Sequence, residues 1–327
     1  MALLAEAVEL LRAGELVAFP TETVYGLGAD AGNPEALAKI FAAKGRPADH
    51  PLIVHVPDVA HLDQWAREIP DAAHLLAQAF WPGPLTLILK RQPTVPDLVT
   101  GGQDTVGLRI PHHPLALQLL KAFDGGIAAP SANRFGHISP TTAQHVREEL
   151  GAAVALVLDG GPCSVGIEST IVDLSRGDPV ILRPGMISAA QIDQALHQQV
   201  VRHSREGGNP VSSPTPRVSG SLAAHYAPTT PMRLVPSDAL AAEAKRCLHD
   251  GQRIAVLSTC SPVAHERLLW RQAASEAGQY AHDLYANLRA LDHAGVDLIL
   301  VEAPPKGSEW VAVNDRLGRA AFGSSSK

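Results

Sequence analysis

The sequence predicts an α/β protein with a twisted mixed sheet and helices in its first 200 residues, followed by a small Rossmann-like α/β unit. Two observations support this fold class. Short apolar runs typical of strands alternate with helical periodicity in the first region, and the same alternation restarts after Met232. The strand-like runs gather late in the first region, so a simple βαβ repeat does not describe it.

The elements can be justified in chain order. The opening stretch MALLAEAVELLRAGE resembles a signal peptide, but Glu6, Glu9 and Arg12 recur at helical spacing without a basic leader, so an amphipathic helix is expected. Strands are expected at LVAF, LIVHV, LTLIL, TVGLRI, GIAAP, ALVLD, STIVDL and PVILR, with helices at 33–44, 70–79, 113–123 and 141–149. In the last region we expect strands at MRLV, RIAVLS and DLILVEA, with helices at 237–249, in stretches to about 294, and near 310–321.

Residues 201–231 are rich in Pro, Gly and Ser and have almost no apolar periodicity, so they are expected to form a linker. Three parts follow: a first domain at 1–200, a linker at 201–231, and a C-terminal domain at 232–327. Within the linker, AAHYAP stands out because a flexible connection needs neither His nor Tyr. The stretch RHSREGGNP at 202–210 resembles a translated dispersed genomic repeat and is interpreted as a tolerated insertion.

Composition excludes several functional classes. The chain has 327 residues, of which 46% are hydrophobic and 18% charged, so it can bury a core. Its net charge of -6 and its 4% aromatic content argue against a protein that coats nucleic acid. The three cysteines lack CxxC spacing, which argues against a disulfide scaffold or a thiolate zinc site and favours a reducing cytoplasm. No run reaches the roughly 18 apolar residues of a membrane span.

The stretch LVAFPTETVYGLGAD raises the question of a dinucleotide fingerprint. Gly26, Gly28 and Gly32 give GxGxxxG, one residue longer than that fingerprint, and PTETVY separates the strand from the first glycine. We expect the glycines to let the chain turn and approach a ligand closely. The two threonines, the carboxylate and the phenol of PTETVYG follow a buried strand, where ligand sites collect, although they could equally satisfy a turn's own backbone groups.

Two further stretches carry cations. In KGRPADHPL, Lys44 and Arg46 lie on a proline-stiffened loop and suit triphosphate oxygens, or simply complement a helix C-terminus. In TVGLRIP, the alternation of a strand places Thr105, Gly107 and Arg109 on one face. Arg109 is there a natural partner for a carboxylate, or else an edge-strand arginine in solvent.

Small hydroxyl residues complete the candidate site. Ser131 and Ser139 in AAPSANRFGHISPTT could cradle an anion before a helix or act as its N-cap, and Ser169 and Arg183 lie at strand margins. The sequence contains no P-loop, no HExxH and no GxSxG. Such a site suits positioning and charge stabilisation, as in nucleotidyl transfer, better than covalent catalysis.

Taken together, PTETVYGLG, KGRP..HPL, WPGPLTLIL, VGLRIP, APSAN and GIESTIVDL resemble the YrdC/Sua5 family of threonylcarbamoyl-AMP synthases. The likeness covers about residues 3–200, and the linker with the last unit resembles the longer Sua5 form. It implies a YrdC-like catalytic domain and a Rossmann-like C-terminal domain in a cytoplasmic enzyme.

The resemblance implies a reaction in which L-threonine, bicarbonate or CO2, and ATP give threonylcarbamoyl-AMP and pyrophosphate. A downstream transferase complex would then pass the threonylcarbamoyl group to the adenosine next to the anticodon of tRNA. Mg2+ is expected with ATP and pyrophosphate and has no diagnostic protein ligand here. No enzyme nucleophile is required, because the carbamate of threonine can attack the α-phosphate directly.

The resemblance also implies roles for individual residues. Lys44 and Arg46 are implied as catalytic cations. The positions similar to the family's threonine contacts are Thr23, His55, Arg109, Ala129 and Ser169. Those similar to its ATP contacts are Arg46, His50, Thr105, Ser131, Ser139, Arg183 and Tyr226. Position 50 is often Asn in the family, and Tyr226 of HYAP resembles a linker tyrosine that folds over the nucleotide as a lid.

Two other functions were weighed. An RNA-binding or translation-factor role, with weak RNA binding, is opposed by the overall acidity and the few aromatic residues. A hydrogenase-maturing carbamoyltransferase combines a YrdC-like domain with zinc-binding modules, which the cysteine count does not support.

Overall fold

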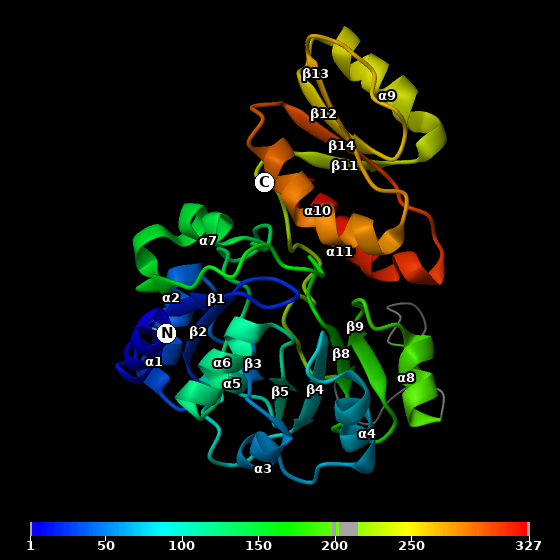
Figure 1. The fold of residues 1–327 in the computed structure, drawn as a ribbon. Coiled ribbons are helices and arrows are strands. Elements are labelled where there is room, and N and C mark those ends of the chain that lie inside the picture. Colours follow the sequence, from blue (N-terminus) through cyan, green and yellow to red (C-terminus); the bar gives the residue numbers. More distant parts are fainter. Residues whose placement is uncertain (1, 198–200, 203–214, 326–327) are drawn as a thin grey trace. The chain divides into compact units, whose positions relative to one another are not determined.

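The computed structural model describes residues 2–197, 201–202 and 215–325, so residues 203–210 of the expected insertion lie outside the described residues. The chain forms two compact units (Figure 1). The first unit comprises Met1–Arg134, Pro140–Ser164 and Glu168–Ser221, and the second comprises Phe135–Ser139, Val165–Ile167 and Leu222–Lys327.

The first unit is built on a mixed sheet with the strand order β10-β9-β8-β4-β5-β3-β6-β2-β1-β7. Its strands are β1 (Val17–Phe19), β2 (Gly26–Asp30), β3 (Ile53–His55), β4 (Leu85–Lys90), β5 (Thr105–Arg109), β6 (Ile127–Ala128), β7 (Leu156–Val157), β8 (Thr170–Asp173), β9 (Val180–Arg183) and β10 (Val201–Arg202). Strands β3 and β5 pair in parallel, whereas β4 and β5 pair antiparallel, which makes the sheet mixed as the sequence predicts.

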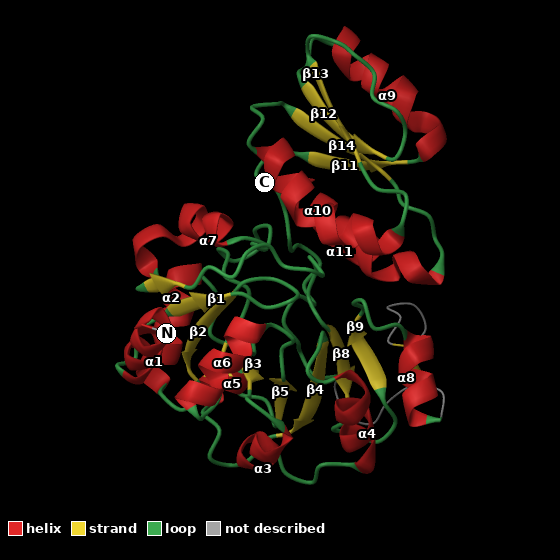
Figure 2. Cartoon of the chain, viewed as in Figure 1, coloured by secondary structure: helices red, strands yellow, loops and turns green. Residues whose placement is uncertain are grey.

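Helices of the first unit surround this sheet (Figure 2). They are α1 (Ala2–Arg12), α2 (Pro34–Lys44), α3 (Leu62–Trp65), α4 (Asp71–Phe80), α5 (Asp97–Thr100), α6 (Pro114–Phe123), α7 (Ala143–Leu150) and α8 (Ala189–Leu196), with short 3-10 turns at Val59–His61 and Gly151–Ala153.

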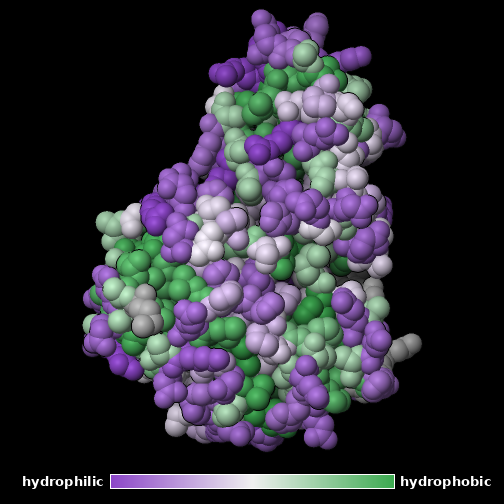
Figure 3. Space-filling model, viewed as in Figure 1, coloured by the Kyte–Doolittle hydropathy of each residue, from purple (hydrophilic) through white to green (hydrophobic). Residues whose placement is uncertain are grey.

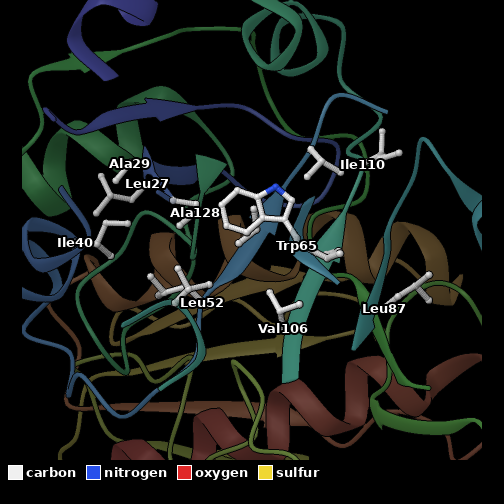
Figure 4. Close-up of a cluster of buried hydrophobic side chains, with 14 of the residues drawn as sticks. Leu27, Ala29, Ile40, Leu52, Trp65, Leu87, Val106, Ile110 and Ala128 are labelled. Carbon is white, nitrogen blue, oxygen red and sulfur yellow. The ribbon is translucent and has the colours of Figure 1, made fainter. Parts of the chain in front are cut away.

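Alternation along the strands divides the core between the two faces of the sheet. Ala18 of β1 joins the larger cluster, to which α2, α4 and α8 also contribute. Figure 4 labels Trp65, Leu87 and Val106 among its side chains. The neighbouring Val17 and Phe19 join a second cluster on the opposite face, formed with α1 and α6. Burial of both faces explains why these strands read as continuous apolar runs.

The second unit has a smaller sheet in the order β11-β14-β12-β13, in which every pair is parallel. Its elements are β11 (Met232–Val235), α9 (Ser237–His249), β12 (Ile254–Ser258), β13 (Leu268–Gln272), α10 (Ala277–Asp292), β14 (Leu298–Glu302), a 3-10 turn (Ser308–Trp310) and α11 (Val311–Ser325). Leu240 and Ala244 of α9 pack with Ile254 and Leu298 of the sheet, as expected for a parallel α/β unit.

Three strands differ from the sequence expectation. β10 begins where the linker was expected and pairs in parallel with β9. Gly26 and Gly28 were expected in a turn, but they lie inside β2, which pairs antiparallel with β1. A Cβ on Gly28 would lie 2.8 Å from the ring of Phe19 and 3.0 Å from the carbonyl oxygen of Val17, so this glycine permits close packing rather than a turn. Residues 268–272 were expected in a helical stretch and instead form β13.

Polar side chains are interspersed with apolar ones over the visible surface (Figure 3). Among the described residues, no helix is both long enough and apolar enough to cross a bilayer.

Candidate active site

Four of the candidate residues lie on strands of the large sheet, and strand register brings them to one face of it. His55 pairs with Arg109 across β3 and β5, and Ile171 pairs with Arg183 across β8 and β9. Thr86 pairs with Ile171 in the parallel β4–β8 ladder. Residues directly opposite in a ladder point to the same side, so His55, Arg109 and Arg183 line one surface although they are distant in sequence.

Three buried basic side chains gather at this surface, namely Lys44, Arg46 and Arg183. Asn33 caps the start of α2 by accepting from the backbone N–H groups of Glu35 and Ala36, and Gly45 at φ 61° ends the helix. This ending fixes Lys44 and Arg46, which are only 3% and 8% exposed. Burial and the nearby Arg46 hold the pKa of Lys44 well below its usual value.

Oxygen atoms of the chain receive hydrogen bonds from these cations. Lys44 Nζ donates to the carbonyl oxygens of Ser131, at 2.6 Å, and Asn133. Arg46 Nη2 donates to Ser219 Oγ at 3.1 Å, and Arg183 Nη1 donates to the carbonyl oxygen of Ser219 at 2.8 Å. Two guanidinium groups therefore bind one residue, which brings Arg46 and Arg183 close together.

The described end of the linker lies against the same surface. Val218 packs with Ile53, Ile88 and Ile171 in a small apolar cluster. A small pocket borders this cluster, and its lining includes Thr105, Gly107, Val218 and Ser219. Ser219 was not singled out by the sequence analysis, because a serine in a polar linker carries no local signal.

Arg109 occupies the next part of the face and pairs with a buried carboxylate. Its Nη2 donates to Glu22 Oε1 at 2.7 Å, and its Nε donates to the carbonyl oxygen of Gly83 at 3.3 Å. The side chains of Arg109 and Glu22 are 5% and 4% exposed. The edge-strand alternative for Arg109 is therefore wrong, since this arginine is buried beside a charged partner.

His55 lies beside Arg109 and is kept neutral. Burial and the positive charge of Arg109 lower the pKa of His55 to about 3. The ring meets Phe19 edge-on, with centroids 6.0 Å apart, and its buried Nδ1 makes no hydrogen bond of normal geometry to the described residues. A neutral imidazole carries one N–H donor and one acceptor nitrogen.

Buried hydroxyls complete this part of the surface. Thr23 Oγ1 lies 2.8 Å from Thr21 Oγ1, which also donates to the carbonyl oxygen of Val24. Ser169 Oγ lies 2.8 Å from Thr86 Oγ1 and accepts from Arg183 Nη2 at 3.1 Å. Thr21 therefore satisfies backbone groups of the turn, as one interpretation of PTETVYG expects. Thr23 and Ser169 are both fully buried, and Ser169 contacts Arg183.

The remaining candidates of the first unit lie on adjoining segments. Ala129 follows β6, and its backbone N–H donates to the carbonyl oxygen of Ile53. Ser131 forms an isolated bridge with Gly26 at the start of β2. His50 is half-buried, and burial with the neighbouring Arg46 lowers its pKa.

Two candidates belong to the second unit, namely Ser139 and Tyr226. Tyr226 is 1% exposed and stacks on Tyr285 with ring centroids 5.7 Å apart, while the guanidinium carbon of Arg316 lies 5.3 Å from its centroid. Its φ of 60° is an outlier for a bulky residue. The tyrosine that stood out in the linker is therefore held by this unit's own aromatic and cationic side chains.

Comparisons with known proteins cover both units. Residues 9–185 match the Sua5/YciO/YrdC family, described as "Telomere recombination", and residues 187–322 match the threonylcarbamoyl-AMP synthase C-terminal domain. The chain is 40% identical to the threonylcarbamoyl-AMP synthase of Pyrococcus abyssi, over 96% of this chain and 93% of that protein. It is also 40% identical to the enzyme of that name from Bacillus subtilis, over 98% and 93% of the two chains.

Solved structures agree with these matches. A structure of P. abyssi Sua5 complexed with L-threonine is similar with a TM-score of 0.86 and 37% identity, covering 98% of this chain and 94% of that one. A doubly substituted form of the same protein gives a TM-score of 0.88. The shared fold, the full-length identity and the clustered candidate residues lead to one conclusion: the chain belongs to the Sua5 family of threonylcarbamoyl-AMP synthases, which are enzymes of the nucleotidyltransferase type.

Proposed function

We propose that this enzyme joins L-threonine, bicarbonate or CO2, and ATP to form threonylcarbamoyl-AMP and pyrophosphate. The observation that carries the proposal is the convergence of Lys44, Arg46 and Arg183, since both arginines bind Ser219 and Arg46 perturbs Lys44. Three buried cations in one place suit a triphosphate, whose negative charge grows on the leaving pyrophosphate.

Arg109 is the residue we assign to the substrate carboxylate. Its Nε and Nη2 are held by Gly83 and Glu22, whereas Nη1 makes no hydrogen bond to the described residues. His55, Thr23, Ala129 and Ser169 are proposed to surround the rest of threonine. The structure of the P. abyssi relative with L-threonine supports this choice of amino acid.

The proposed chemistry needs alignment rather than an enzyme nucleophile. The amine of threonine takes up CO2 and loses a proton, giving a carbamate. A carbamate oxygen then attacks the α-phosphorus of ATP as the bond to the pyrophosphate oxygen breaks. Lys44 and Arg46 are proposed to stabilise the charge that develops on the leaving group, while Thr105, Ser131, His50, Ser139 and Arg183 position the nucleotide.

Mg2+ is proposed to accompany ATP. The described residues contain no group of three or more His, Cys, Asp or Glu side chains placed to hold a metal ion. In phosphoryl-transfer sites Mg2+ is commonly held by substrate phosphates, water and one or two carboxylates. When bound, it would neutralise phosphate charge beside the three cations.

Tyr226 is proposed to act as a lid residue over the nucleotide. In the present structure its ring stacks on Tyr285 and lies close to the guanidinium of Arg316, and the residue is 1% exposed. We propose further that the product passes, in the cytoplasm, to a transferase complex that modifies the adenosine next to the anticodon of tRNA.

Pyrophosphate release from ATP, measured with each amino acid in turn and with or without bicarbonate, tests the proposal. Threonine with bicarbonate should give the largest stimulation, and mass spectrometry should detect threonylcarbamoyl-AMP. An absence of threonine-dependent release would refute the proposed reaction.

A further inference from the structure

Glu22 is a buried carboxylate whose two oxygens both accept hydrogen bonds from the site's framework. Oε1 accepts from Arg109 Nη2 at 2.7 Å, and Oε2 accepts from the backbone N–H of His112 at 2.9 Å. The residue is 3% exposed. It therefore ties the PTETVYG segment after β1 to the end of β5 across 87 positions of sequence.

This contact fixes how the guanidinium of Arg109 is turned. The plane of a guanidinium is defined once two of its three nitrogens are held, and here Glu22 holds Nη2 while Gly83 holds Nε. Nη1 makes no hydrogen bond to any part of the chain that the structure describes. Nη1 of Arg109 can therefore donate to an acceptor atom of a ligand, beside the neutral ring of His55.

We propose that Glu22 is a positioning residue for substrate recognition, which sets the orientation of Arg109 so that Nη1 receives the carboxylate of the amino acid. The inference rests on the proposed function, because it takes threonine as the ligand of Arg109. Glu22 itself does not touch the substrate in this account. Both of its oxygens are used in holding the framework.

The acceptor geometry distinguishes a carboxylate from its amide at this position. Two N–H groups, from Arg109 and from His112, donate to Glu22, and an amide offers only one oxygen. Glu22→Gln must therefore turn its NH2 group toward a donor and release one of them. A buried donor left unsatisfied costs about 1–3 kcal/mol, which corresponds to about a 5- to 150-fold change in an equilibrium.

The test measures steady-state pyrophosphate release by the full chain with threonine and ATP varied separately. Glu22→Gln should raise the KM for threonine about 5- to 150-fold while the KM for ATP changes little, and the donor left unsatisfied should also lower the melting temperature. Glu22→Asp keeps the charge but is one methylene shorter, so it should raise the threonine KM as well. This second variant preserves the test if Glu22→Gln fails to fold.

Two comparisons separate positioning from general damage. Asp173→Asn removes another buried carboxylate of the first unit, one that accepts from Ser175, and should leave both KM values unchanged. In an Arg109→Met background, adding Glu22→Gln should cause no further loss of kcat/KM for threonine, because the residue acts through Arg109.

The outcomes are distinct. If Glu22→Gln lowers the threonine KM while Glu22→Asp does not, Glu22 competes with the substrate for Arg109 and the positioning role is overturned. Equal changes in both KM values, or an additive loss in the Arg109→Met background, would overturn it too. Failure of the proposed function looks different, since the unsubstituted enzyme would then show no threonine-dependent pyrophosphate release.

Discussion

His55 provides a prediction that depends on burial and charge alone. Its pKa is about 3 in the folded protein, against an ordinary value of 6.5, because burial and Arg109 both oppose the protonated ring. Between these two pH values the unfolded chain binds a proton that the folded chain does not. Stability therefore rises with pH in this window and is lost as the pH falls below 6.5.

The magnitude follows from the two pKa values. A pH of 5 lies about 1.5 units below the pKa of this ring in the unfolded chain and well above its pKa in the folded protein. Each unit corresponds to 1.36 kcal/mol, so the folded state loses about 2 kcal/mol between pH 7.5 and pH 5 through this residue. The His55 side chain is 3% exposed, so solvent screens this effect little.

Urea unfolding at the two pH values tests this, followed by tryptophan fluorescence, to which Trp65 in the core of the first unit contributes. His55→Gln has no titrating ring. Between pH 7.5 and pH 5 the unfolding free energy of the unsubstituted protein should therefore fall by about 2 kcal/mol more than that of His55→Gln. His74→Gln, on the exposed side of α4, is the matched control and should show no such shift. An equal difference at both pH values would refute the reasoning.

Three further predictions concern other parts of the chain. Arg46→Met should raise the KM for ATP about 10- to 100-fold and leave the threonine KM almost unchanged, as measured by pyrophosphate release. Gly28→Ala should lower the unfolding free energy by about 1–3 kcal/mol, because the added Cβ meets Phe19 and backbone; an unchanged urea midpoint would contradict this. Tyr226→Ala should raise the KM for ATP or the release of hydrolysed intermediate. The control Tyr285→Leu weakens the same ring stack but keeps Tyr226, so it should raise neither. Unchanged kinetics for Tyr226→Ala would contradict the lid role.

Hydrophobic patterning was enough to locate most strands of the fold but not those with unusual surroundings. β2 was missed because glycines carry no apolar signal, and its place depends on close packing against Phe19. β13 was missed because its stretch LLWRQ has residues compatible with a helix and is largely exposed. Pairing with β12 along five residues decides its structure, and such a tertiary contact is absent from a local pattern.

The candidate residues of the first unit could be found by motif, but their relations could not. Thr105, Gly107 and Arg109 share a face by simple alternation, as predicted. In contrast, the pairing of Glu22 with Arg109 joins segments 87 positions apart. The shared use of Ser219 by Arg46 and Arg183 likewise depends on where the linker end docks. A local sequence pattern cannot predict either of these tertiary contacts.

The hydrogen bonds from Arg46 and Arg183 to Ser219 have a thermodynamic consequence for the linker. An anion that draws on the same guanidinium groups must either share them with Ser219 or displace it. In both cases anion binding and docking of residues 217–219 are linked equilibria, and each changes the free energy of the other by the same amount. The linker end therefore occupies hydrogen-bonding positions of Arg46 and Arg183 that an anion would also use, and a change in how firmly it docks would change the affinity for that anion.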